Sequence, residues 1–413
     1  MLLLENISTL VTVPGGDGTM PRRSGAAMNE IGVLRNADVA IAGDTIEWAG
    51  PHGERSFPGA EKLDCTGRTV LPGFVDSHTH IVFAGNRSGE FAARLRGATY
   101  QEIAAAGGGI LSTMRAVRSS TLQEIVEQCR PLVRNAFRHG STTIEAKSGY
   151  GLDTESELKL LEAIAVLNRE EAPTLVPTFL GAHDMPPEHR ENREAYITEI
   201  IERMIPQVAG RGLAEFCDVF SDTGYFTVEE SERIFDAAKR HGMRTRVHAD
   251  ELSSFGGAEM AARIGALSAD HLLMISDDGI EQMREAGVIA TLLPGTAFYL
   301  RLPYAPARRM IERDLAVALA TDCNPGSNMC ENMQMTIALA CMGMRMTVEE
   351  AITASTLNGA AALGISDRVG SITPGMQADL AIFNVADYPE IAYHYGVNHV
   401  SAVVKQGKVY EVA

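Results

Sequence analysis

The sequence predicts an α/β protein, a (β/α)8 TIM-type barrel that carries a small β domain assembled from both chain ends. Eight apolar runs alternate with helical segments between residues 71 and 368. Short β-type runs, separated by glycine, proline and aspartate turns, occupy residues 1–70 and 369–413. Polar residues that can bind metal or transfer protons follow several of the central runs, where a barrel of this type has its active site.

Composition limits the class of protein and its partners. At 413 residues the chain is long enough for one large domain and a smaller one. No run approaches the roughly 18 apolar residues of a membrane span, and the first residues lack the basic leader of a secretory signal. We therefore expect a cytoplasmic protein that does not bind membranes. The six cysteines contain no Cys-x-x-Cys pair, which is typical of free thiols in a reducing compartment.

The net charge of the protein limits the partners and substrates that it can bind. A net charge of -17 argues against nucleic acid as a partner, because phosphate binding needs a basic face. A small anionic substrate would need a specific cationic anchor in the site. A homodimer is the expected assembly, as it is common among soluble enzymes.

The two chain ends contribute the predicted β domain. Its N-terminal part, residues 1–70, contains β-type runs at 10–13, 39–42, 45–48 and 68–71. Its C-terminal part, residues 369–413, has β-type runs at 370–384, 400–404 and 408–412.

The predicted barrel spans residues 71–368. Its strand candidates are 74–78, 141–146, 174–180, 215–220, 244–249, 266–270, 288–293 and 316–321. Several helices between them begin with a Thr-x-x-Glu capping box, at Thr99, Thr121, Thr154, Thr227 and Thr347. A doubly wound open sheet is the competing architecture, but the Gly-x-Gly-x-x-Gly turn that would favour it is absent after the first strand.

The run Leu-Pro-Gly-Phe-Val-Asp-Ser-His-Thr-His, residues 71–80, is the strongest local signal. It reads as a buried strand that ends in two histidines. Because residues i and i+2 of a strand share a face, His78 and His80 can converge on one metal ion, with Asp76 on the same row.

Further candidate ligands follow other predicted strands. His248 ends strand five, His271 ends strand six after Asp270, and Asp322 ends strand eight. Three imidazoles and a carboxylate suit one divalent ion such as zinc or iron, with a position left for water as in catalytic sites.

Two residues are candidates for proton transfer. Glu251 lies three residues after His248, where the chain can fold back over the barrel mouth, and its carboxylate could move a proton from water to a leaving nitrogen. His271 could be a metal ligand, a proton carrier or a donor that stabilises an oxyanion, and we favour the last two roles.

The strand-one run, the histidines that end strands five and six, the strand-eight aspartate and the closing Thr-Pro-Gly-Met-Gln-Ala-Asp-Leu together resemble the amidohydrolase superfamily. This resemblance implies that the β domain is a sandwich. The match narrows at 83–87, 104–110, 147–152, 179–184, 216–220, 248–251 and 320–327, which resemble the imidazolonepropionase family of histidine degradation. That family implies hydrolysis of 4-imidazolone-5-propanoate to N-formimino-L-glutamate, with cleavage of a ring C–N bond.

The resemblance assigns roles to individual residues. It implies His78, His80, His248 and Asp322 as metal ligands. It places at the substrate Arg87, Tyr150, His183 and Glu251, with the strand-eight loop facing the glutamate portion of the product through Asn324, Gly326 and Ser327. Arg87 offers a planar two-pronged donor for the propanoate. Lys147 is expected to be unmodified, because only one set of ligands is visible.

Two other functions remain open from the sequence. A mononuclear purine or pyrimidine deaminase could use the same ligands, although Asn86 and Arg87 suit a flexible carboxylate better than a neutral base. A catalytically inactive, metal-free binding protein would be the other class, but all ligand positions and Glu251 are present.

Overall fold

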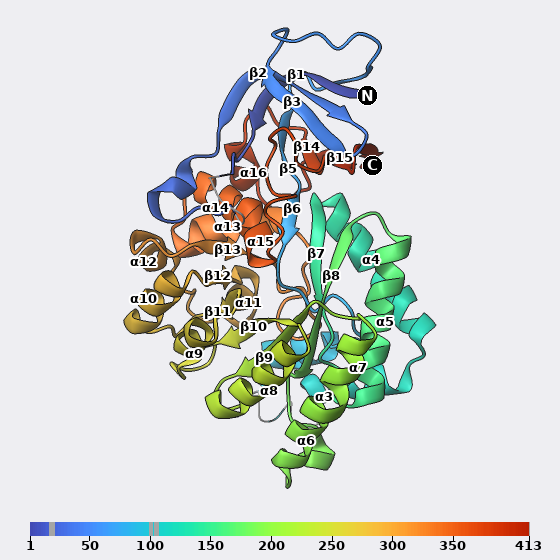
Figure 1. The fold of residues 1–413 in the computed structure, drawn as a ribbon, viewed down its shortest axis with the longest axis vertical. Helices are drawn as coiled ribbons and strands as arrows, with labels where there is room; N and C mark the ends of the chain where they lie inside the picture. Colours follow the sequence, from blue (N-terminus) through green and yellow to red (C-terminus); the bar gives the residue numbers. More distant parts are fainter. Residues whose placement is uncertain (16–20, 99–101, 103–106, 413) are drawn as a thin grey trace.

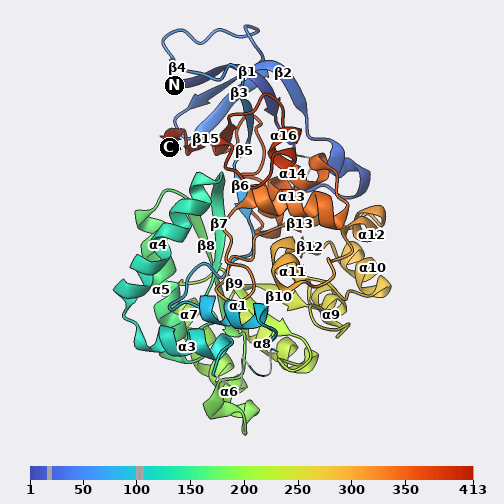
Figure 2. The ribbon, with the colours of Figure 1, turned by 180° about the vertical axis from the view of Figure 1, so that it is seen from behind.

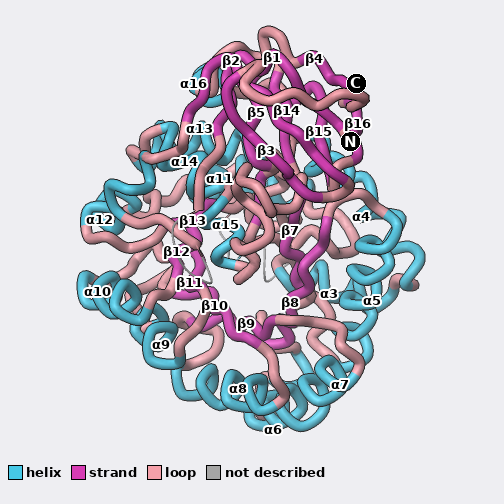
Figure 3. The backbone as a smooth tube through the Cα atoms, turned by 45° about the horizontal axis from the view of Figure 1, so that its top comes forward, coloured by secondary structure: helices cyan, strands magenta, loops and turns pink. Residues whose placement is uncertain are grey.

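The computed structural model describes residues 1–15, 21–98, 102 and 107–412, and it contains a barrel with a smaller β domain above it (Figure 1). Eight parallel strands form the barrel sheet in sequence order. They are β6 (Phe74–Asp76), β7 (Ser141–Lys147), β8 (Thr174–Ala182), β9 (Phe216–Ser221), β10 (Arg244–Ala249), β11 (Ser268–His271), β12 (Ile289–Leu292) and β13 (Val317–Leu319). Each overlaps one predicted run, which confirms the barrel. Figure 3 shows these strands inside and the helices around them.

The first and last barrel strands meet through the residues that follow them. The amide of Asp322 donates to the carbonyl of His78 at 2.9 Å, and the amide of His80 donates to the carbonyl of Cys323 at 3.0 Å. The prediction that the first strand reaches 78 was wrong, since β6 ends at Asp76. The two histidines therefore converge because this seam holds their backbone, not because they alternate along a strand.

Helices surround the barrel. They are α1 (Ser88–Leu95), α3 (Ile110–Ser119), α4 (Leu122–Arg138), α5 (Thr154–Glu170), α6 (Arg193–Glu199), α7 (Ile205–Gly210), α8 (Val228–Arg240), α9 (Gly257–Ile264), α10 (Asp277–Ala286), α11 (Pro294–Leu300), α12 (Ala307–Glu312), α13 (Met333–Met344), α14 (Val348–Ser355) and α15 (Leu357–Ala362). A π-helical segment, Ile200–Met204, joins α6 to α7, and short 3-10 helices cover Gly25–Asn29 and Pro187–His189. No helix in the described part of the chain is long and apolar enough to cross a bilayer.

The capping boxes show how the sequence sets helix starts. Three of the five predicted boxes are confirmed, those at Thr121, Thr227 and Thr347. The prediction at Thr154 was wrong: Asp153 caps α5, and Glu157 is buried beneath a loop of the site. The predicted box at Thr99 lies outside the described residues.

The β domain is built from both ends of the chain, as Figures 1 and 2 show. The N-terminal part supplies β1 (Leu2–Val11), β2 (Val33–Ala42), β3 (Thr45–Pro51), β4 (Glu61–Asp64) and β5 (Thr69–Pro72). The C-terminal part supplies β14 (Leu380–Phe383), β15 (Val400–Lys405), β16 (Lys408–Glu411) and the short helix α16 (Pro389–Tyr393). The eight strands form one mixed sheet in which β5 pairs antiparallel with β14, so both ends are joined. Its own apolar core includes Leu4, Ile7 and Leu380.

Aromatic contacts fix the β domain to the barrel. The ring of Phe74 on β6 lies 5.7 Å from that of Phe383 on β14. Phe137 on α4 meets Tyr410 on β16 edge to face, with centroids 5.3 Å apart. Both barrel residues belong to the large apolar core, so the interface continues that core.

Candidate active site

Four side chains converge at the carboxyl ends of β6, β10 and β13. The Nε2 atoms of His80 and His248 lie 3.2 Å apart. Oδ1 of Asp322 lies 3.5 Å from Nε2 of His78 and 3.6 Å from Nε2 of His80. All four residues are buried. The structure thus brings together the four residues that the family resemblance implied as metal ligands.

The cluster fits a divalent metal ion. Nε2 of His78 and Oδ1 of Asp322 are buried and have no hydrogen-bond partner among the described residues. Burial lowers the pKa of His78 and of His80 well below the usual value, so both imidazoles are neutral, the form that binds metal. Unpartnered donor atoms of this type are the ligands that borderline divalent ions prefer.

A carboxylate and an arginine fix the ring of His78 from behind. Oδ2 of Asp270 lies 2.6 Å from Nδ1 of His78 and accepts a hydrogen bond from Nη2 of Arg246 at 3.0 Å. The same Nη2 donates to the carbonyl of Ser77 at 2.6 Å. Because Asp270 engages Nδ1, the lone pair of Nε2 is left for the cluster.

His248 has a matching arrangement that uses lysine. Oδ2 of Asp218 lies 2.9 Å from Nδ1 of His248 and 2.8 Å from Nζ of Lys147, which lies 2.8 Å from Oε1 of Glu145. Burial acts to lower the pKa of Lys147, but the two carboxylates outweigh it and leave that pKa raised. The amine is therefore charged and engaged, which supports the interpretation of Lys147 as unmodified.

Glu251 lies in the loop after β10, beside the cluster. Its Oε1 is 3.6 Å from Nδ1 of His271. Burial raises the pKa of Glu251 to about 8, so this carboxyl can both take up and release a proton at neutral to mildly alkaline pH.

His271 is placed for more than one role. Its ring lies 5.1 Å from that of His248 and 5.4 Å from that of His78, and neither ring nitrogen has a hydrogen-bond partner among the described residues. Its donor atom lies within 4.8 Å of those of His78 and His248. From this position His271 can contact Glu251 and can also approach the proposed metal ligands.

Four residues at or after the ends of β10, β11 and β13 have left-handed backbone. Asp250, His271, Leu272 and Asp322 have φ values of 49°, 76°, 59° and 53°. This conformation costs a residue other than glycine about 1 to 2 kcal/mol, so the surrounding contacts must hold it. Such residues concentrate where geometry serves a site.

His183 and Tyr150 form one wall of the site. The ring of His183 stacks on that of His80, with centroids 4.9 Å apart and planes 21° apart, and its Nδ1 lies 2.9 Å from the carbonyl of Gly149. The Tyr150 ring lies 5.7 Å from His80 and 5.2 Å from His183. The buried carboxylate of Glu157 holds this loop by accepting from the amides of Gly149, Gly151 and Leu152.

Arg87 lies just before α1 with only 10% of its side chain exposed. Its Nε donates to Oε2 of Glu90 at 2.9 Å. A Cβ atom on Gly326 would lie 2.3 Å from Nη1 of Arg87, so a larger residue there would displace the guanidinium. Arg87 and Asn86 line a cavity of about 750 Å³, together with apolar residues that include Phe83, Phe91 and Tyr299.

The strand-eight loop uses its polar side chains internally. Oδ1 of Asn324 accepts from the amides of Gly326 and Ser327 at 2.8 and 2.7 Å, and its Nδ2 donates to the carbonyl of Asp322 at 2.7 Å. The hydroxyl of Ser327 accepts from the same Nδ2 at 2.8 Å. Both side chains therefore shape the loop beside Arg87.

Sequence reasoning missed several residues that support the ligands. Arg246 lies two residues before His248 on β10, and Glu145 lies two before Lys147 on β7. The strand period of two would have placed each pair on one face. No sequence signal identified Asp218 as the partner of His248, because that contact joins separate strands.

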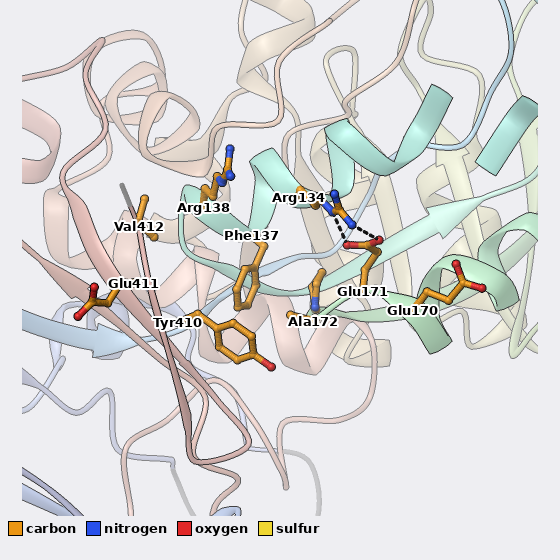
Figure 4. A pocket seen from close by; sticks show the side chains of 10 residues that line it. Arg134, Phe137, Arg138, Glu170, Glu171, Ala172, Tyr410, Glu411 and Val412 are labelled. Carbon is orange, nitrogen blue, oxygen red and sulfur yellow. Dashed lines mark hydrogen bonds and ion pairs between the residues drawn. The ribbon is translucent and has the colours of Figure 1, made fainter. Parts of the chain in front are cut away.

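A cleft of about 400 Å³ lies at the other end of the barrel (Figure 4). It is bounded by the ends of α4 and α5 and by β16, beside the start of β8. Arg134 donates to Oε2 of Glu171 at 2.7 Å and to its Oε1 at 3.1 Å. Its cation is thus neutralised, and none of the predicted site residues lies there.

The fold and the cluster define a class of protein. A sequence model of the amidohydrolase family matches residues 69–410, so the chain belongs to the amidohydrolase family. Among solved structures the chain resembles an atrazine chlorohydrolase of Arthrobacter aurescens, with 15% identity, a TM-score of 0.72 and coverage of 99% of this chain and 95% of that one. It also resembles an adenosine deaminase of Xanthomonas campestris, with 19% identity, a TM-score of 0.71 and coverage of 100% and 93%. These likenesses show the shared fold.

Within the family, the curated relatives are more specific. An imidazolonepropionase of Geobacillus thermodenitrificans is 47% identical over 99% of this chain and 97% of its own. Another, from Porphyromonas gingivalis, is 46% identical with the same coverage. At this identity over almost the whole length, the chain groups with the imidazolonepropionases. The family and the histidine cluster together support a divalent metal ion.

Proposed function

We propose that this chain hydrolyses the ring C–N amide bond of 4-imidazolone-5-propanoate to N-formimino-L-glutamate, a step of histidine degradation. The observation that carries this proposal is the buried cluster of three imidazoles and a carboxylate, with Glu251 beside it, in a chain 47% identical to an imidazolonepropionase. The expected substrate is a small anion.

We infer that one divalent ion, zinc or iron, is held by His78, His80, His248 and Asp322. Such an ion lowers the pKa of water toward about 7 and polarises a carbonyl oxygen. The ammonium of Lys147, between two carboxylates, supports a single ion, because it supplies locally the positive charge that a second ion would bring.

The chain's own residues then move the protons. Glu251 takes a proton from the attacking water, whose oxygen adds to the ring carbonyl carbon, and delivers that proton to the ring nitrogen as the C–N bond breaks. The added oxygen becomes part of the new carboxylate. His271, within 3.6 Å of Glu251, orients that carboxyl and stabilises the negative charge that develops on the carbonyl oxygen.

The remaining residues bind the substrate. Arg87 pairs with the propanoate, since Glu90 engages its Nε and leaves both Nη groups for a two-pronged contact. Tyr150 and His183 contact the ring from the wall beside His80. The loop of Asn324, Gly326 and Ser327 faces the glutamate portion of the product.

The change Arg87→Met tests the substrate assignment. Losing a charged partner in a partly desolvated pocket costs about 2 to 5 kcal/mol, or roughly a 30- to 3000-fold fall in kcat/KM. We expect that fall for imidazolone propanoate and little change for an uncharged imidazolone without the carboxylate. Steady-state kinetics on both compounds measures the ratio within each enzyme, which cancels general damage.

Arg96→Met provides a matched control, because Arg96 follows α1 on the exposed surface. It should leave both activities unchanged. If Arg87→Met lowers activity on the two compounds by the same factor, Arg87 is structural and the carboxylate is bound elsewhere.

A further inference from the structure

The loop between β10 and α9 carries Glu251 and is fixed on its N-terminal side by Asp250. The Asp250 carboxylate accepts four backbone hydrogen bonds of 2.8 to 3.2 Å, from the amides of Phe255, Gly256, Gly257 and Ala258. Its carbonyl accepts from the amide of Met274 at 2.8 Å. The residue before Glu251 is thus tied both to the start of α9 and to the turn after β11.

The residues after Glu251 are held by Asp222, which follows β9. Oδ2 of Asp222 accepts from the amide of Leu252 at 2.8 Å, and its Oδ1 accepts from the hydroxyl of Ser253 at 2.8 Å and from the amide of Thr223 at 2.7 Å. The hydroxyls of Thr223 and Ser253 also lie 2.8 Å apart. The side chain of Asp222 is buried, with only 1% exposed, so its carboxylate lies beneath the loop that it binds.

Apolar packing does little to hold Leu252, the residue that follows Glu251. The side chain of Leu252 is among the exposed large apolar residues, at 48%. A loop with little buried apolar surface is mobile unless polar contacts restrain it. Asp222 supplies such contacts at the two residues that directly follow Glu251.

We propose that Asp222 is a positioning residue that holds the Glu251 carboxylate in place for proton transfer by binding the backbone of Leu252 and the side chain of Ser253. This inference rests on the proposed role of Glu251. Nothing links Asp222 to the metal ligands or to Arg87 in the contacts described above, so its effect should fall on turnover and not on metal or substrate binding. The negative charge of Asp222 also contributes to the raised pKa of Glu251.

The test is a double-mutant cycle with Asp222→Ala and Glu251→Gln, assayed on imidazolone propanoate with metal content measured for every variant. Misplacing a catalytic group by about 1 Å can cost 10²-fold. We expect Asp222→Ala to lower kcat by about 10- to 100-fold, with KM within about twofold and metal content unchanged. In the Glu251→Gln background the same change should lower kcat by less than about twofold, because residues that act through one another are not additive.

Asp38→Ala is the matched control. Asp38 is 4% exposed and lies in the β domain, far from the site. Like Asp222, it is a buried carboxylate that accepts hydrogen bonds from backbone amides, here those of Asn6 and Gly53. It should leave kcat unchanged. If Asp222→Ala does not fold, Asp222→Asn keeps one carbonyl oxygen for these bonds and should show a smaller loss of kcat that also disappears in the Glu251→Gln background.

Three results would overturn the inference: full kcat in Asp222→Ala, loss of metal in that variant, or an equal loss of kcat with and without Glu251→Gln. Retained kcat in Glu251→Gln alone would instead overturn the proposed role of Glu251. The failure of the positioning role and the failure of the proposed mechanism are therefore distinguishable.

Discussion

Replacing Glu251 with glutamine should lower kcat by about 10²- to 10⁴-fold, the scale of general acid–base catalysis. Glutamine keeps the size and hydrogen-bonding shape of the side chain, but its amide cannot accept or release the proton. Because Glu251 is not among the proposed ligands, metal content should equal that of the parent protein. Steady-state kinetics with metal analysis on the same samples makes the measurement.

A matched control lies in the next helix. Glu259 on α9 accepts from the hydroxyl of Ser276 at 2.5 Å and is not among the site residues. Glu259→Gln should leave kcat within about twofold, because the amide keeps an oxygen that can accept the hydrogen bond from Ser276. Unchanged kcat in Glu251→Gln would contradict the shuttle role and transfer it to His271.

Asp322→Ala should remove most of the bound metal and nearly all activity while the barrel stays folded. The carboxylate is one of four proposed ligands, whereas the barrel is held by an extended apolar core that does not depend on the ion. Metal analysis after gel filtration gives the first readout, and circular dichroism gives the second.

Thr296→Val gives a graded version of this experiment. The hydroxyl of Thr296 donates to Oδ2 of Asp322 at 2.5 Å and leaves Oδ1 toward the histidines. Losing a partner of a ligand typically costs about 10- to 100-fold in metal affinity or activity. Near-stoichiometric metal and full turnover in Asp322→Ala would refute the ligand assignment, and two ions per parent chain would refute the single-ion inference.

The barrel could be predicted because its signals are local. Apolar runs of strand length alternate with helices whose first residues are marked by capping boxes, as at Thr121 and Thr227. The number and the order of the strands could therefore be predicted from the sequence. Strand ends were less accurate. The strand predicted at 74–78 stops at Asp76, because the seam with the last strand is made by backbone that follows both strands.

One strand of the β domain has no recognisable pattern in the sequence. β4 was not predicted, because Glu-Lys-Leu-Asp is a short, charged strand with a single apolar side chain. It is recognisable only once β1 lies beside it, a pairing of residues about sixty positions apart.

In the site, too, features with a local sequence signal could be predicted and contacts between distant residues could not. Residues at strand ends, such as His248 and Asp322, could be predicted because barrel geometry collects them at one end. The residues that hold these side chains could not be predicted. Asp218 contacts His248 from the neighbouring strand β9, and Asp222, which follows β9, binds the loop that carries Glu251. Contacts of this kind arise from packing between elements and leave no period in the sequence.

The central claim is hydrolytic ring opening of imidazolone propanoate by a metal-loaded chain. It is tested most directly by incubating the purified, metal-quantified protein with 4-imidazolone-5-propanoate, and separately with guanine and with cytosine, while both N-formimino-L-glutamate and ammonia are measured. The account predicts stoichiometric N-formimino-L-glutamate without ammonia from the first compound and no reaction with the two bases. Ammonia release from a base, with imidazolone propanoate left intact, would contradict it.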